Sequence, residues 1–256
     1  MNQSTKSDGL RTLLFIDILG FAALTEANPS AVARCDPDAR GRVEVGPSLL
    51  QKQMLKFQAV LEGLFSDEAI KAQAMLFSDC AYLVTAEASA AALVAADLMR
   101  AFILERVPVR MGIGKGTFHG FELSLSLSPS KESVSRCLFA GTGVVLAHAA
   151  EQCGGKGLRI FVHRSVEADL SKTRNVRLVR LKERFLNARW ELNYLPQRGI
   201  VQRSSSVEAG VQDLMDAVSE MKKAAKSAPA RIRRHYVHTL KSLGRMRAQR
   251  EPKSRT

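Results

Sequence analysis

Two aspartates interrupt apolar segments of the chain in a way that favours metal chemistry. Asp17 lies in the run LLFIDILGFAALT, residues 13–25, and Asp79 lies between the apolar segments AMLF and CAYLVT. Carboxylates at the ends of neighbouring strands bind Mg²⁺ or Mn²⁺, because these hard cations take oxygen ligands, and a pair of such ions orients phosphoryl transfer. The two residues are 62 positions apart, so this hypothesis requires a fold that brings their strands together.

The residues that follow Asp17 indicate a phosphate-binding turn. Gly20 comes directly after the strand-like run, and a glycine there lets the backbone N–H groups at a helix start approach a polyphosphate closely. The carbonyl oxygen of Ile18 is a further candidate metal ligand. Lys115 in GIGKG lacks the spacing of a P-loop, which favours a solvated turn lysine at that position.

Each of these residues also has a purely structural explanation. Asp17 could cap the start of a helix, and Asp79 could be an ordinary turn residue in a hairpin. Arg110 could be a surface arginine on a strand or a phosphate ligand. His119 and His148 have no partner at metal-ligand spacing, which favours structural or exposed side chains.

The hydrophobic pattern predicts the elements that must position these residues. RTLLFID indicates a buried strand, and AMLFSDCAYLVT indicates a hairpin with its tip at Ser78 and Asp79. Apolar residues at helical spacing predict helices at about 48–65 and 88–105. Further elements are expected as follows: a strand after Pro108, a glycine-marked turn, an alternating strand at 121–127, a helix that stops at Gly154 and Gly155, and strands in LRIFVHRSV, RNVRLVRLKER and ARWELNYLP.

This order of elements predicts an α+β fold. Split β-α-β units form a ferredoxin-like sandwich, in which helices cover one face of an antiparallel or mixed sheet. In such a sheet the first strand and the first hairpin are neighbours, so Asp17 and Asp79 can converge on one edge. We expect a disordered lead at residues 1–9, a catalytic domain at 10–203 and a basic helical C-terminal extension at 204–256.

The net charge of +13 is concentrated near the C-terminus. Residues 222–255 contain twelve Lys or Arg and one acidic residue, Glu251, so the rest of the chain is nearly neutral. This extension could be a solvated helix pair, a docking surface for acidic partners or a nucleic-acid contact. It has one aromatic residue, Tyr236, and matches no nucleic-acid-binding motif, so nucleic acid is the least favoured partner.

Composition excludes several other classes. No apolar run reaches the roughly 18 residues that a membrane helix needs, and the N-terminal residues lack a signal-peptide pattern. We therefore expect a cytoplasmic protein with no membrane partner. The four cysteines are widely spaced and form no C-x-x-C pair, which predicts free, mostly buried thiols and argues against a zinc site.

Three motifs resemble those of the class III nucleotidyl cyclases, over roughly residues 11–165. FIDILGF matches the family's aromatic-x-Asp-Ile-x-Gly-Phe motif at every fixed position, FSDCAYLV resembles its second metal-aspartate motif with Ser78 in place of glycine, and VRMGIGKG resembles its Arg-x-Gly-Ile-x-x-Gly strand. The resemblance implies the class III catalytic fold, two Mn²⁺ or Mg²⁺ ions held by Asp17, Asp79 and the Ile18 carbonyl, and a homodimer with each site at its interface. It also implies the substrate-binding set Phe15, Ile18, Leu19, Gly20, Phe21, Arg110, Met75 and Leu138.

The base- and ribose-binding positions depart from the usual pattern of that family. Val145 stands where the ribose-binding asparagine is usual, and Ala149 stands where the transition-state arginine is usual. Met75 replaces the lysine that reads adenine, and Leu138 falls near the second base-reading position, although both could equally be plain core residues. The altered set resembles that of the pyrimidine cyclases of the bacterial Pycsar antiphage system.

This resemblance implies a second-messenger enzyme. UTP, or as a second choice CTP, would be converted to a 3′,5′-cyclic nucleotide and pyrophosphate, and the product would activate a downstream effector protein. Three alternatives remain: a catalytically inactive nucleotide-binding sensor, motivated by Val145 and Ala149; a cyclase that acts on purine nucleotides; and a nucleic-acid binder that uses the basic extension.

Overall fold

The computed structural model describes residues 8–27, 49–65, 72–126, 133–195, 207–228 and 230–249. Their strands form a mixed sheet in the order β2-β3-β1-β4-β6-β8-β7, with β5 paired to β4 outside this path. The strands are β1 (Asp8–Ile18), β2 (Gln73–Leu76), β3 (Cys80–Thr85), β4 (Val109–Ser126), β5 (Ser133–Ala140), β6 (Ile160–His163), β7 (Leu178–Arg180) and β8 (Ala188–Leu192). The predicted α+β class with a mixed sheet is confirmed.

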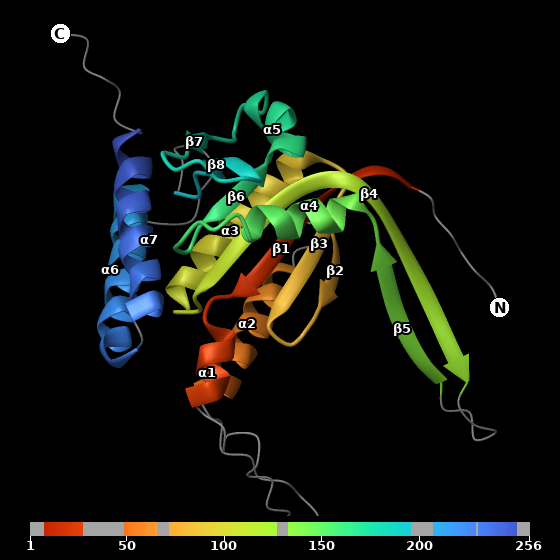
Figure 1. Ribbon diagram of the computed structural model, residues 1–256, viewed down its shortest axis with the longest axis horizontal. Helices are drawn as coiled ribbons and strands as arrows, with labels where there is room; N and C mark the ends of the chain where they lie inside the picture. Colours follow the sequence, from red (N-terminus) through yellow and green to blue (C-terminus); the bar gives the residue numbers. More distant parts are fainter. Residues whose placement is uncertain are drawn as a thin grey trace, which may run out of the picture.

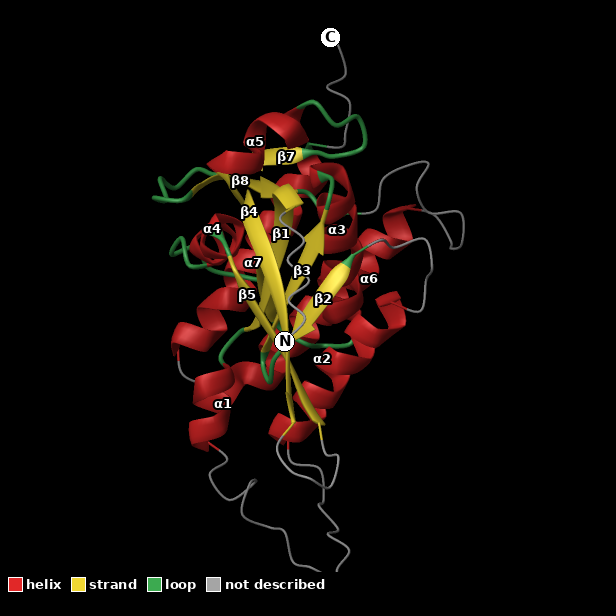
Figure 2. Ribbon diagram, turned by 90° about the vertical axis from the view of Figure 1, so that its right-hand side faces the viewer, coloured by secondary structure: helices red, strands yellow, loops and turns green. Residues whose placement is uncertain are grey.

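Helices flank this sheet on more than one side (Figures 1 and 2). They are α1 (Phe21–Ala27), α2 (Leu49–Phe65), α3 (Ala88–Leu104), α4 (Thr142–Glu151), α5 (Arg164–Ser171), α6 (Val207–Ala224) and α7 (Ala230–Ala248), with a short 3₁₀ turn at Ala225–Ser227. None of the helices in the described residues is both long and apolar enough to cross a membrane.

Strand β1 lies in the middle of the sheet and divides its side chains between two cores. It pairs antiparallel with β3 on one side and with β4 on the other. Because strand side chains alternate between faces, Leu14 and Ile16 join the large core beneath α2 and α3, whereas Leu13 and Phe15 join a smaller cluster on the opposite face. Asp17 has the parity of Leu13 and Phe15, so its carboxylate belongs to the smaller-cluster face.

Strand β4 is continuous from Val109 to Ser126, so the expected glycine-marked turn is wrong. Gly112 and Gly114 lie two residues apart and face α4 directly. A Cβ atom at Gly112 would stand 2.2 Å from the carbonyl oxygen of Ala147, and one at Gly114 would stand 2.5 Å from the Ala147 nitrogen. The alternating glycines therefore leave one face of the strand bare, which lets α4 lie against it. Helices were expected on one face of the sheet only, but α4 covers the other face.

The remaining elements match the sequence expectations unevenly. The helices expected at 48–65 and 88–105, the hairpin tip at Ser78 and Asp79, and the strand expected in RTLLFID, residues 11–17, are confirmed. Strand β5 and helix α5 were not expected, and the segment LRIFVHRSV holds both β6 and the start of α5. Residues 1–7 and 28–48 lie outside the described residues, and Asp8 begins β1 within the expected disordered lead.

The two C-terminal helices complete the main core. Helix α6 packs against α3 and α7, and Figure 1 shows α6 and α7 side by side along one flank of the sheet. Leu214 and Val218 of α6 and Leu243 of α7 are buried in the same cluster as the central strands. Glu191 of β8, fully buried, accepts a hydrogen bond from Ser242 Oγ at 2.8 Å. The extension is therefore helical as predicted, and it shares its core with the sheet.

Candidate active site

The structure brings Asp17 and Asp79 together at one end of the sheet. Asp17 is the penultimate residue of β1 and lies opposite Cys80, the residue after Asp79. The backbone N–H of Ile18 donates a hydrogen bond to the carbonyl oxygen of Asp79 at 3.0 Å. Ser78 Oγ donates to Asp79 Oδ1 at 2.9 Å and orients this carboxylate. The predicted convergence of the two strand ends is confirmed, and the metal role of the aspartates stays a prediction.

Negative charge is concentrated around these two residues. Burial, followed by the charges of Glu151 and Asp79, raises the pKa of Asp17 from 3.8 to about 7, against the opposing effect of Arg110. Burial, followed by the charges of Asp79, Asp17 and Glu151, raises the pKa of the neighbouring Cys80 thiol to about 11. When neighbouring carboxyl groups are partly removed from water, each one favours the neutral form of the other. A bound cation would reverse this effect.

Arg110 lies on β4, the strand next to β1, and is paired in register with Asp17. Its guanidinium forms an ion pair with Glu151, the last residue of α4, and its Nη1 donates to the carbonyl oxygen of Gly155 at 3.0 Å. Glu151 is fully buried, and burial raises its pKa while Arg110 and His148 oppose that shift. The predicted phosphate role of Arg110 stays a prediction, and it would require the guanidinium to exchange or share these partners.

The turn after β1 has the backbone that a phosphate-binding turn needs. Gly20 is exposed and has a φ of 78°, in the left-handed region that glycine tolerates without strain. Leu19 donates its N–H to the carbonyl oxygen of Pro108 at 2.8 Å, which ties the turn to the start of β4. The side chains of Leu19 and Phe21 pack partly against the main core. These two residues therefore hold the turn in place through apolar contacts.

The predicted base-reading residues lie in different surroundings. Met75 of β2 is buried in the small cluster with Phe15 and Tyr82. Leu138 lies on β5 and is 54% exposed, although its neighbour Phe139 turns inward to within 5.4 Å of the Tyr82 ring, centroid to centroid. The face of the sheet beside Asp17 therefore carries apolar and aromatic side chains.

Helix α4 presents an exposed side on this same face of the sheet. Val145 is 65% exposed, and Ala149, one helical turn later, is half-buried. His148 is exposed and stands edge-on to the ring of Phe15, with 5.0 Å between ring centroids. The positions expected to carry ribose and transition-state groups therefore have small or apolar side chains.

The described residues offer an oxygen-only set for a metal ion. They contain no group of three or more His, Cys, Asp or Glu side chains arranged to hold a metal. Two carboxylates and a backbone carbonyl at Ile18 suit Mg²⁺ or Mn²⁺, which keep several ligands from water or from substrate phosphates. Burial, followed by the charges of Glu151 and Asp79, raises the pKa of Asp17, and a cation bound beside it would favour its ionised form. The residues present therefore fit such ions.

Helix α7 also reaches the site, and no pattern in the sequence predicts this contact. A Cβ atom at Gly20 would lie 3.7 Å from Cδ1 of Ile232. His235 Nδ1 accepts a hydrogen bond from the N–H of Gly157 at 3.1 Å. Burial, followed by the charges of Arg110 and other nearby cations, lowers the pKa of His235 to about 4. Neither an amphipathic pattern nor a motif in α7 indicates which residues it would contact.

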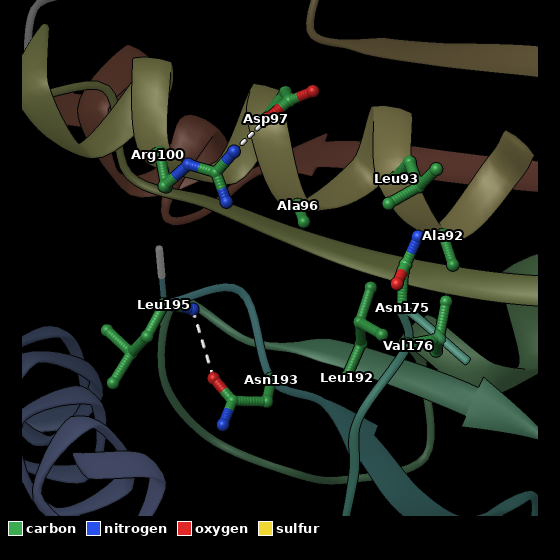
Figure 3. Close-up of a pocket in the computed structure, with 10 residues that line it drawn as sticks. All are labelled: Ala92, Leu93, Ala96, Asp97, Arg100, Asn175, Val176, Leu192, Asn193 and Leu195. Carbon is green, nitrogen blue, oxygen red and sulfur yellow. Dashed lines mark hydrogen bonds and ion pairs between the residues drawn. The ribbon is translucent and has the colours of Figure 1, made fainter. Parts of the chain in front are cut away.

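A pocket with a volume of about 120 Å³ lies elsewhere, between α3, the segment at 175–176 and the end of β8 (Figure 3). Arg100 Nη1 donates to the carbonyl oxygen of Tyr194 at 2.9 Å, and Asn193 Oδ1 accepts from the N–H of Leu195 at 3.0 Å. None of its ten lining residues is a predicted site residue. Ligand pockets usually enclose about 300–1,000 Å³, so this one is too small for a nucleotide.

Comparison with known proteins gives distant structural neighbours. No family model matches the chain, and no curated protein matches it. Among solved structures, it is similar to the catalytic core of a rhodopsin-guanylyl cyclase with converted specificity in complex with ATPαS (TM-score 0.48, 14% identity, 74% of this chain and 97% of that one). It is also similar to the adenylyl cyclase CyaB from P. aeruginosa (0.47, 12%, 78% and 100%) and to the guanylyl cyclase Cya2 (0.43, 19%, 78% and 98%). These similarities are too distant to assign an activity to this chain.

Proposed function

We propose that this chain is a metal-dependent nucleotidyl cyclase that converts UTP, or CTP, to the 3′,5′-cyclic nucleotide and pyrophosphate. The observation that carries the proposal is the meeting of Asp17 and Asp79 at the ends of paired strands, joined through the hydrogen bond from Ile18 to Asp79. Burial, followed by the negative charges of Glu151 and Asp79, raises the pKa of Asp17 to about 7, and a divalent cation would favour the ionised carboxylate.

In this proposal the chain's residues bind and orient the reacting groups. Asp17, Asp79 and the carbonyl of Ile18 would hold two Mn²⁺ or Mg²⁺ ions, and the exposed Gly20 turn would receive the phosphates. When bound, the ions neutralise phosphate charge and lower the pKa of the ribose 3′-hydroxyl. The 3′ oxygen forms a bond to the α-phosphorus, the bond to the bridging oxygen breaks, pyrophosphate leaves with the electron pair, and the hydroxyl proton passes to solvent.

The apolar floor of the site supports a pyrimidine substrate. Met75 is buried among Phe15 and Tyr82, and its thioether cannot donate a hydrogen bond to a purine edge. Leu138 on β5 is likewise without a polar group. These side chains lack the polar groups with which a purine base is usually read, and this departure, which resembles that of the pyrimidine cyclases, is what favours UTP or CTP.

The proposed partner is a second copy of the chain. Phe77, Leu138 and Val145 are large apolar side chains exposed near the small cluster that includes Phe15. Apolar side chains gathered at one surface favour a protein interface. A homodimer that buries them would complete each site with groups from the other copy. The cyclic product would then serve as a second messenger for antiphage defence by activating an effector protein.

One observation favours a second candidate, a nucleotide-binding sensor without turnover. Arg110 is bound to Glu151 and Gly155, and Val145 and Ala149 supply no polar side chain where ribose and transition-state ligands are expected. Such a sensor would bind nucleotide through Asp17 and Asp79 but would not release pyrophosphate.

Incubation of the purified protein with each of the four nucleoside triphosphates and Mn²⁺ separates these candidates. The cyclase proposal predicts a cyclic product from UTP or CTP, with pyrophosphate released in equal amount. The sensor predicts nucleotide binding by calorimetry with no pyrophosphate. A cyclic product from ATP or GTP alone would overturn the pyrimidine assignment while leaving the cyclase in place.

A further inference from the structure

The face of the sheet that carries Asp17 also carries a connected group of aromatic rings. Phe15, two residues before Asp17 on β1, has its ring centroid 4.6 Å from that of Tyr82 on β3. Phe77 and Phe139 approach the same tyrosine at 6.4 and 5.4 Å between ring centroids. Tyr82 is therefore the ring that all three phenylalanines contact.

The hydroxyl group of Tyr82 has no hydrogen-bond partner within this group of side chains. The residue is 8% exposed, and its neighbours are apolar apart from the partly buried Cys80. Buried tyrosines usually pair their hydroxyl, yet none of the residues that the structure describes is hydrogen-bonded to this one. Its oxygen is not among the fully enclosed, unpaired side-chain atoms of those residues, so it reaches the edge of the cluster. A hydrogen-bonding group is therefore available there to a bound molecule.

This hydroxyl lies towards the end of the cluster where the two aspartates meet. Tyr82 is paired in register with Met75, and Cys80, two residues earlier on the same face of β3, is paired with Asp17. Burial, followed by the charges of Cys80 and Glu151, raises the pKa of Tyr82 to about 12, so the hydroxyl feels the carboxylate that also acts on Asp17. Two residues along a strand span about 7 Å, a distance that a nucleoside bridges between its phosphate and its base.

A nucleobase has two requirements that these side chains meet. Its faces stack on aromatic rings, and the ring of Phe77, 43% exposed, is open to such a contact. Its polar edge must form hydrogen bonds once the base is removed from water. Met75 and Leu138, the residues expected to read the base, have no hydrogen-bond donor. A phenol both donates and accepts, so it can pair with the edge of uracil or of cytosine.

We propose that Tyr82 is a specificity-determining residue of the site, whose hydroxyl forms a hydrogen bond with the polar edge of the pyrimidine base while the base rests against Phe77. This inference rests on the proposed function for the identity of the ligand. It gives the base edge a partner that Met75 and Leu138 do not supply. It also gives a use to the one hydroxyl in an otherwise apolar aromatic cluster.

The test compares Tyr82→Phe, which removes the hydroxyl and keeps the ring, with Tyr236→Phe, which makes the same change in the main core on α7. The ligands are 3′-deoxy-UTP and 3′-deoxy-CTP with Mn²⁺, which lack the attacking hydroxyl, so isothermal titration calorimetry reads binding without reaction. For the nucleotide that wild type binds more tightly, we expect Tyr82→Phe to bind about tenfold more weakly, because the base edge is left unpaired. Tyr236→Phe should bind it like wild type.

Inorganic tripolyphosphate, which has no base, provides a control ligand for the same proteins. Both variants should bind it with wild-type affinity and should melt as cooperatively as wild type. Kinetics with UTP and CTP provide a further readout. Tyr82→Phe is expected to raise KM about tenfold with little change in kcat, because the lost contact is made equally to substrate and transition state.

Three results would overturn the proposal. The first is equal affinity of wild type and Tyr82→Phe for the 3′-deoxy nucleotide. The second is an equal loss of tripolyphosphate binding in that variant, since the hydroxyl would then support the site as a whole and would not read the base. The third is a wild-type protein that binds neither 3′-deoxy-UTP nor 3′-deoxy-CTP.

Failure of this inference is distinguishable from failure of the proposed function. A wild-type protein that makes cyclic product from UTP or CTP, with Tyr82→Phe unchanged in binding and in KM, removes the role of Tyr82 and leaves the cyclase. A wild-type protein that makes no cyclic product, with 3′-deoxy nucleotide binding weakened only in Tyr82→Phe, retains that role and removes the cyclase.

Discussion

Arg110 belongs to a motif that is visible in the sequence, but its ion pair and hydrogen bond are made with residues outside that motif. Its place opposite Asp17 follows from strand pairing, but its partner Glu151 comes from the end of α4, 41 residues later. Glu151 is fully buried, so removal of Arg110 would leave a carboxylate without its counter-charge. Arg110 therefore has a structural role that any substrate role must share.

His235 provides a pH-dependent test of how α7 is docked. Its pKa is lowered from 6.5 to about 4 by burial and then by Arg110, Lys156 and His238, which face it from β4, from the segment after α4 and from α7 itself. The unfolded chain therefore binds a proton near pH 6.5, whereas the folded chain does so only near pH 4. Because the unfolded state holds more protons in this window, stability is full above pH 6.5 and falls as the pH drops towards 4.

The variant His235→Asn keeps a side-chain acceptor near the N–H of Gly157 but does not titrate. Urea denaturation at pH 7.5, 6.0 and 5.0 should show a stability advantage of wild type that shrinks on acidification. Parallel curves, with the same difference at every pH, would contradict the account of His235 as a neutral, docked imidazole.

The glycines of β4 show what a sequence pattern leaves open at the scale of an element. Glycines stand at every second position, 112, 114 and 116. They predict a turn if glycine is taken to interrupt a strand, but within a strand they leave one face free of side chains. Whether these glycines form a turn or a continuous strand depends on the packing of α4, which is a tertiary contact. Apolar runs were easier to interpret, because burial of β1, α2 and α3 requires the periodicity that the sequence displays.

Two glycine variants test the role assigned to β4. Gly114→Ala places a Cβ 2.5 Å from the backbone nitrogen of Ala147, so α4 must move, and we expect a loss of about 1–3 kcal/mol in the free energy of unfolding. Gly63→Ala, in α2, meets nothing within 4 Å and should stabilise by about 0.5 kcal/mol, because alanine is the better helix former. Denaturant titration measures both. Equal effects of the two substitutions would contradict the close packing of α4 on β4.

The candidate site was predictable in part, for reasons that differ between residues. Asp17 and Asp79 could be paired from the sequence, because adjacent strands of a predicted sheet fix their neighbourhood. The contacts of Arg110 with Glu151, and of Gly20 with Ile232, join segments whose relative placement no periodicity encodes. Phe139 likewise reaches Tyr82 from β5, an element that the sequence analysis did not anticipate.

At the scale of the whole molecule, the C-terminal helices are part of the main core, whereas an apolar surface on the other face of the sheet is exposed. Helices α6 and α7 belong to the main core, so their removal would expose Leu214, Val218 and Leu243 to water. Truncation is therefore an unsuitable test of the basic residues, and single charge changes are preferable. The surface around Val145 and Leu138, in contrast, is available to a second copy.

A homodimer predicts a specific response to a charge at that surface. Val145→Asp should shift the mass measured by light scattering from dimer to monomer and abolish product formation, because a buried, unpaired carboxylate is costly at an interface. Leu186→Asp is the matched control, since Leu186 is 90% exposed on the segment between β7 and β8 and should change neither property. An identical mass for the two variants would contradict the proposed interface.

A metal-dependent cyclisation site at Asp17 and Asp79 can be tested by mass-spectrometric detection of cyclic UMP and cyclic CMP after incubation with UTP or CTP and Mn²⁺. The wild-type protein and Asp213→Asn, which changes an exposed aspartate of α6, are predicted to yield product. Asp17→Asn and Asp79→Asn are predicted to yield at least a hundredfold less while melting as cooperatively as wild type. Product formation that persists in both aspartate variants, or is absent from the wild-type protein, would contradict the account.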